Sequence, residues 1–307
     1  MKPYVVFFFF LLATCARVWA QDFSETYSRE TLTQWRGLPQ RTTTKILDTV
    51  VWPAMLPHEL AAFGNQKPHL EFPLFAEEAM RRHPLAFYVP SDRRSIVFPV
   101  FSLKFLDDLC TAYAWLQVRG YSLETISEYT AIIAYGDRNQ KIPAPLDVLG
   151  IPKDARERDS AISELALGHF VTARTFLLAH EIAHAMYRHK PVSSEVSIAN
   201  ETEADRFAAA LMSRTPLPPL GILVFFMADA HWSGYPTGTT HPLTGRRVIA
   251  LSDYVSDPVL ALKFRRLGEL LDDEDIRDGF AKTGNASDLG ALHPRRPGGM
   301  PRQPGQR

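Results

Sequence analysis

The clearest chemical signal in the sequence is the pentapeptide His180-Glu181-Ile182-Ala183-His184. Residues four apart lie on one face of an α-helix, so His180 and His184 can present two imidazoles to one metal ion. Zinc is often held in this way, at about 2.0–2.1 Å from each ring nitrogen. Glu181 then flanks the ion without binding it and can serve as a general base. The spacing therefore predicts a catalytic zinc site.

The residues around this motif predict a helix that is apolar on nearly every side. Phe176 to Met186 is mostly apolar, basic residues follow in the last turn, and Pro191 ends the pattern. Two imidazoles and a carboxylate on such a helix cost free energy unless partners or a metal satisfy them. The alternative is a structural helix whose two histidines are satisfied by other protein groups.

A third ligand is expected from the downstream segment that begins at Asn200. Glu201 and Asp205 are four residues apart, hence on one face of a second helix that runs to about Ser213. Glu201 can complete a His₂Glu site with an open fourth position, and Asp205 can accept the spare N–H of a ligand imidazole. The alternative is a capping box of Asn200 and Glu203, which explains Glu203 and leaves Asp205 unexplained.

Together these segments resemble the HExxH…ExxxD arrangement of gluzincin metallopeptidases, and within them the M48-like group. The residues after Glu203 are also similar to ImmA/IrrE-type peptidases, and Leu103 to Tyr121 resembles Lit-like phage-exclusion peptidases. The M48 resemblance extends to the stretch from His241 to Arg247. It implies that His241 and Arg247 bind the tetrahedral intermediate or hold the site's carboxylates, with Arg246 as the alternative to Arg247.

The resemblance implies a zinc metalloendopeptidase that acts on peptide or protein substrates. Its fold would be α+β, a zincin-like domain with an active-site helix, a second ligand helix and a small upstream β-sheet. Only sixteen residues separate His184 from Glu201, fewer than in most M48 relatives, so the subfamily and the substrate stay open.

Hydrophobic patterning predicts the elements that position these motifs. Short strands are expected at Leu85–Tyr88 and Ser95–Phe101, and helices at Ser102–Arg119, Ser122–Tyr135 and Ser160–Gly168. Asp137–Pro152 is expected to be a loop. Strands followed by clustered helices favour α+β over alternating βαβ units.

The chain divides into four expected parts: a signal peptide at 1–20, an N-terminal region of possible regulatory role at 21–80, the gluzincin-like domain at 81–284, and a disordered Pro/Gly/Arg tail at 285–307. These parts predict a periplasmic or secreted protein without a stable membrane span after cleavage. The alternatives are an uncleaved inner-membrane anchor and lipidation at Cys15. The tail matches no helix or strand pattern.

Composition excludes several classes of protein. Lys and Arg total 34, as do Asp and Glu, so no basic surface points to nucleic acid. Two cysteines supply no disulfide framework, and the spacing of Cys110 with Leu106 predicts a buried side chain. The oligomeric state is left open. Two alternatives to a peptidase remain, a non-catalytic zinc-stabilised binding module in the periplasm and an exported binding domain without a metal.

Overall fold

The computed structural model of the protein describes residues 25–80, 83–90, 95–135, 143–190, 194–233 and 244–272. This part of the chain is mostly helical and contains one small parallel sheet, an arrangement compatible with the expected α+β class. Within these residues no helix is both long enough and apolar enough to cross a bilayer. The expected signal peptide (1–20) and tail (285–307) lie outside the described residues.

Helix α9 (Ser160–Tyr187) carries the HExxH motif. It begins after Asp159, whose carboxylate accepts a hydrogen bond from the Ala161 N–H (3.0 Å), and ends at Arg188 in the left-handed conformation (φ 58°). The separate short helix expected at Ser160–Gly168 is the first part of α9. One glycine costs a helix only about 1 kcal/mol, which a packed helix tolerates.

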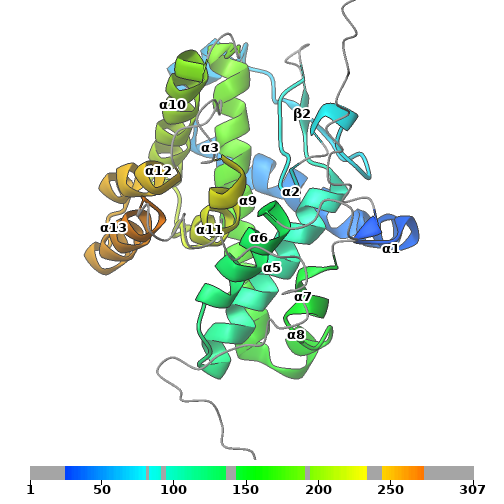
Figure 1. Ribbon diagram of the computed structural model, residues 1–307. Helices are drawn as coiled ribbons and strands as arrows, with labels where there is room; N and C mark the ends of the chain where they lie inside the picture. Colours follow the sequence, from blue (N-terminus) through cyan, green and yellow to red (C-terminus); the bar gives the residue numbers. More distant parts are fainter. Residues whose placement is uncertain are drawn as a thin grey trace, which may run out of the picture.

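Three helices surround α9: α5 (Val100–Arg119), α10 (Ser194–Met212) and α11 (Gly221–Ser233). Figure 1 shows α10 beside the upper part of α9 and α5 beside its lower part. Because neighbours cover α9 on several sides, apolar side chains are needed on nearly all of its faces. Cys110 on α5 is buried, as expected, and burial raises the pKa of its thiol well above the ordinary value.

The sheet pairs β1 (His69–Glu71) with β2 (Ser95–Val97) in parallel, with Leu70 opposite Ile96. The strand expected at Ser95–Phe101 is therefore too long, because Pro99 precedes α5 and begins a helix instead. The strand expected at Leu85–Tyr88 is also wrong in extent. Only Tyr88 pairs with β2, through an isolated antiparallel bridge to Val97.

The N-terminal region is helical and packs on the same core as the rest of the protein. Leu32, Leu47 and Val51 from this region are buried in that core. Its elements are α1 (Arg29–Trp35), α2 (Gly37–Ile46), the π-helix η2 (Leu47–Val51), α3 (Trp52–Ala54), α4 (Pro57–Ala62), β1 and the 3₁₀ turn η3 (Glu78–Met80). Strand β1 pairs with β2, so residues on the two sides of position 80 share one sheet.

The remaining helices lie on either side of α9 in the sequence. Before it come α6 (Glu124–Tyr135), close to the expected helix, and two short helices, α7 (Pro145–Val148) and α8 (Ala155–Arg158). Helix α7 falls within the expected loop 137–152, of which residues 137–142 lie outside the described part. After α11 come α12 (Thr244–Leu251), the turn η4 (Ser252–Tyr254) and α13 (Pro258–Asp272), and α12 packs on α13 at the left of Figure 1.

Helix α11 approaches α9 closely at its first residue, Gly221. A Cβ at this position would lie 1.8 Å from the His169 carbonyl oxygen and 2.5 Å from the Thr172 hydroxyl. The Gly221 N–H donates a 2.8 Å hydrogen bond to that hydroxyl. The absence of a side chain at Gly221 therefore lets α11 pack directly on the backbone of α9.

Candidate metal centre

The two histidines of the HExxH motif lie one turn apart near the C-terminal end of α9, on the same face of the helix. The Nε2 atoms of His180 and His184 lie 2.9 Å apart, and Glu181 lies beside them in the same cleft. His180 and Glu181 are both buried. The four-residue spacing brings the two imidazoles together, as helical geometry requires.

Helix α10 brings Glu201 against both imidazoles. Its Oε2 atom lies 3.3 Å from His180 Nε2, and its Oε1 atom lies 3.4 Å from His184 Nε2. A tetrahedral site with bonds of about 2.0–2.1 Å separates its ligand atoms by about 3.3–3.4 Å. The two distances from Glu201 fit this geometry. The distance between the Nε2 atoms of His180 and His184 is about 0.4 Å shorter than the tetrahedral value. The three side chains form a group that can hold a metal ion.

Each imidazole is held from behind by a separate set of side chains. His180 Nδ1 lies 3.0 Å from Oδ1 of Asp205, one turn after Glu201 on α10. His184 Nδ1 lies 3.0 Å from Nδ1 of His189, whose Nε2 contacts Oε2 of Glu203 at 3.0 Å. These contacts fix the ring orientations and leave both Nε2 atoms facing the same point.

Arg247 of α12 lies behind the carboxylates and is buried. Its guanidinium donates two hydrogen bonds to Asp205, at 2.7 and 2.9 Å, and a longer one to Glu201 at 3.4 Å. It also lies 3.7 Å from Asp229 of α11 and over the ring of Phe226. The donors of Arg247 thus face carboxylates, which is the second of the two roles implied by the M48 resemblance.

The buried charges shift the protonation of the centre. Burial lowers the pKa of His180, but the contacts with Asp205 and Glu201 outweigh it and raise the pKa to about 10. Burial and the neighbouring His180 lower the pKa of His184 to about 3. Burial raises the pKa of Asp205, but Arg247 and His180 bring it below the ordinary value. Metal binding at this centre therefore competes with protonation of His180.

Two residues of the centre were missed by sequence analysis, His83 and Asp229. His83 Nε2 lies 3.1 Å from Oδ1 of the buried Asp229, and His83 Nδ1 accepts a 3.1 Å hydrogen bond from the Leu85 N–H. Asp229 thereby connects the segment before β2 with Arg247. Neither residue belongs to a local motif, so no signal in the sequence identifies them.

The centre opens into a cleft of about 990 Å³. One part of its lining comes from α9, α10 and α11, and another part is the segment 85–90. The peptide groups of Ala86 and Phe87 on this segment make no hydrogen bond within the described part of the chain. Both residues are buried, with exposed fractions of 4% for Ala86 and 9% for Phe87.

Two expected residues remain, His241 and Arg246. His241 lies outside the described residues. Arg246 is exposed and does not line the cleft, so among the two arginines it is Arg247 that faces the centre.

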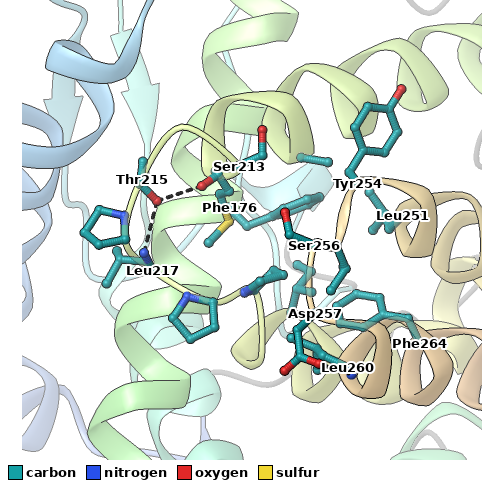
Figure 2. Close-up of a pocket in the computed structure, with 17 residues that line it drawn as sticks. Phe176, Ser213, Thr215, Leu217, Leu251, Tyr254, Ser256, Asp257, Leu260 and Phe264 are labelled. Carbon is teal, nitrogen blue, oxygen red and sulfur yellow. Dashed lines mark hydrogen bonds between the residues drawn. The ribbon is translucent and has the colours of Figure 1, made fainter.

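Behind Phe176, which stacks on His180 with 6.2 Å between ring centroids, lies a smaller apolar pocket of about 420 Å³. Figure 2 shows Phe176 at this pocket together with Leu260 and Phe264 of α13. Thr215 orders the proline-rich loop of this pocket, because its hydroxyl donates to the Met212 carbonyl (2.8 Å) and accepts from the Leu217 N–H (3.3 Å).

Comparison with protein families gives a match over the region of the metal centre. Residues 139–258 match the Peptidase U49 family. The match covers about two fifths of the chain and includes α9, α10, α11 and α12 with every described residue of the metal centre except His83. The chain is thus similar to peptidases over the region that carries the site. Neither a curated protein nor a solved structure shows significant similarity to the chain.

This finding supports one part of the expected resemblance, the Lit-like part. The match is to the Lit-like peptidases of family U49 and does not support an M48 assignment. The Lit-like resemblance was seen at Leu103 to Tyr121, which precedes the matched residues. The similarity therefore comes from the segment with the metal motifs instead.

Proposed function

We propose that the protein is a zinc-dependent peptidase in which His180, His184 and Glu201 bind the ion and Glu181 is the general base. The observation that carries this proposal is the meeting of the three ligand groups beside Glu181, within a region similar to a peptidase family. A structural zinc site has no need of the additional carboxylate or of an open cleft.

Hydrolysis of a peptide bond then depends on the residues around the cleft. Zinc, when bound, supplies Lewis acidity that activates water and polarises the substrate carbonyl. Glu181 accepts the proton of the attacking water and returns it to the leaving amine. Asp205 and Arg247 are positioning residues, because they orient His180 and Glu201 and balance the buried charge.

The segment 85–90 is the proposed substrate-binding wall. The segment lines the cleft, so an extended peptide that enters the cleft can pair with its backbone, which satisfies the peptide's own backbone without selection for one sequence. This mode of binding suits a protein or peptide substrate. The expected export of the protein through residues 1–20 also stays a prediction.

The test is the substitution Glu181→Gln, with Glu164→Gln as the matched control on the exposed face of the same helix. Glu181→Gln is expected to retain about one zinc ion per chain and to lose about 10²–10⁴-fold in peptide hydrolysis, because the amide cannot accept the proton. Glu164→Gln should retain both properties. Metal content and cleavage of a peptide library are measured on the same samples.

Wild-type cleavage by Glu181→Gln with full zinc content would contradict the role of Glu181. If both His180→Ala and His184→Ala retained full zinc content, the proposed ligand set would be contradicted. A wild-type protein that binds zinc and cleaves no peptide would favour the zinc-stabilised binding module instead.

A further inference from the structure

We propose that a second pocket, between α1, α2, α5 and the first half of α9, binds an amphipathic carboxylate, an apolar body that carries one carboxylate group. The pocket has a volume of about 670 Å³, within the range of ligand sites. It shares no lining residue with the cleft of the metal centre. It is therefore a separate site, and the proposal does not depend on peptidase activity.

Arg174 of α9 is the cation at the floor of this pocket, with only 1% of its surface exposed. Its Nε donates to the Phe170 carbonyl (3.2 Å), and its Nη1 donates to the hydroxyls of Thr42 (2.7 Å) and Thr43 (3.1 Å). The remaining Nη2 group makes no hydrogen bond to a described residue, yet it is not sealed from solvent. One donor of a buried cation is thus left for a ligand.

The neighbouring charges leave Arg174 without a carboxylate of its own. Asp107 accepts a hydrogen bond from Arg156 at 2.9 Å, and Asp108 pairs with Lys104. Arg174 forms no ion pair with any described residue. Burial lowers its pKa to about 10, partly offset by Asp107, so it stays charged at neutral pH. Lys104, Arg156 and Arg174 thus face two carboxylates, and Arg174, which lies 4.0 Å over the Phe170 ring, has no carboxylate to neutralise it, which favours an anionic ligand.

Apolar side chains lead from this floor to the surface. Trp35 and Phe170 line the pocket, and their rings lie 6.2 Å apart between centroids. Leu38 and Leu167, at the mouth, are 57% and 50% exposed. Such exposed leucines next to a pocket are suited to contact an apolar ligand body.

The rim of the pocket limits the charge of the ligand. Asp147 and Glu157 are exposed there beside Lys153, which pairs with Asp147 at 2.9 Å, so the rim offers no net positive charge to a multiply charged anion such as phosphate. The ligand thus needs a single negative charge and an apolar body. A monocarboxylate with an aliphatic or aromatic body has both, because its charge reaches Arg174 and its body contacts Trp35 and Leu167. A fatty acid and the C-terminal end of a peptide share this chemistry.

The experiment is calorimetric titration of the purified chain, freed of metal so that carboxylates have no ion to bind in the other cleft. Octanoate represents the fatty acid, N-acetylphenylalanine represents a peptide end, and octylamine is the probe of opposite charge. Octanoate or N-acetylphenylalanine is expected to bind saturably, and the tighter of the two identifies the source. Octylamine is expected to bind at least about tenfold more weakly.

Two substitutions locate the binding. Arg174→Gln should weaken carboxylate binding by about tenfold or more, since it removes a charge-assisted hydrogen bond. Leu167→Glu changes only an exposed mouth residue and should have a similar effect by repulsion, so the test remains decisive if Arg174→Gln fails to fold. The control is Leu262→Glu on α13, which is 49% exposed and distant from the pocket lining.

The proposal is overturned if neither carboxylate binds at millimolar concentration. It is also overturned if octylamine binds as tightly as the acids, or if Leu167→Glu and Leu262→Glu bind the acids with equal affinity.

Discussion

Each histidine of the candidate metal centre has its own acidic partner, and the two partners differ in burial. His180 contacts Asp205, whose side chain is 6% exposed, whereas His184 is reached from Glu203 only through His189, and Glu203 is 56% exposed. Solvent screens an exposed carboxylate more than a buried one. Orientation of the centre should therefore depend more on Asp205 than on Glu203.

This difference is tested with Asp205→Asn and Glu203→Gln. Asp205→Asn is expected to lower zinc affinity or activity about 10–100-fold. Loss of a carboxylate that orients a metal-ligating histidine usually has an effect of this size. Glu203→Gln should cost less than about tenfold, because its contact is solvent-exposed and indirect. Zinc affinity is measured by competition with a chromophoric chelator. A larger loss in Glu203→Gln would show that the His189 contact orients the centre.

At this scale the sequence predicted the residues that belong to a local pattern. The HExxH spacing places His180 and His184 together, and the four-residue spacing of Glu201 and Asp205 places both on one face of α10. His83 and Asp229 were missed because their contact joins segments 146 positions apart in the chain, and periodicity carries no information on such pairs.

Among the elements, the contact between α9 and α11 at Gly221 allows a direct prediction. Gly221→Ala should destabilise the protein by about 1–3 kcal/mol, because the added Cβ meets backbone of His169 that cannot move aside. Gly168→Ala is the matched control. A Cβ there contacts nothing within 4 Å, so the change should stabilise α9 by about 0.5–1 kcal/mol.

Chemical denaturation of both variants gives the free energies of unfolding. An unchanged or higher stability of Gly221→Ala would show that α11 does not approach α9 as closely as described.

The same junction contains a buried histidine whose pKa makes stability depend on pH. Burial lowers the pKa of His169 to about 4, and its ring packs on Tyr113. The unfolded chain takes up a proton near pH 6.5, whereas the folded protein does so only near pH 4. Stability from this group is thus complete above about pH 6.5 and falls by about 3 kcal/mol as the pH drops to about 4.

The pH effect is measured as the difference between the wild type and His169→Gln, by denaturation at a series of pH values. The wild type should lose stability faster than the variant between pH 6.5 and 4. Parallel curves in this interval would mean that His169 titrates normally.

The elements themselves were predicted unevenly. The bounds of α5 and α6 were predicted to within about two residues, because both helices have apolar residues at helical spacing and a glycine directly after their last residue. α11 was missed because its residues are apolar on all sides and show no helical period. The strands were overestimated because short β-branched and aromatic runs fit a helix start as well as a strand.

For the molecule as a whole, the proposed ion joins α9 to α10, and Arg247 connects that pair to α12. Removal of zinc should therefore lower the melting temperature, by roughly 10 °C where free zinc is about a thousandfold above its Kd. Thermal unfolding with and without a chelator measures the change, and re-addition of zinc should reverse it. His180→Ala serves as the control and should show no response. An equal melting temperature of the wild type in both conditions would contradict a bound metal.

The position of Arg247 in the chain also bears on biosynthesis. The ribosome releases α9 and α10 before α12, so the buried carboxylates Glu201 and Asp205 exist for a time without their cation. Until α12 docks, these acids favour contact with water over burial against α9. The candidate metal centre is thus expected to be completed only after translation has passed residue 247.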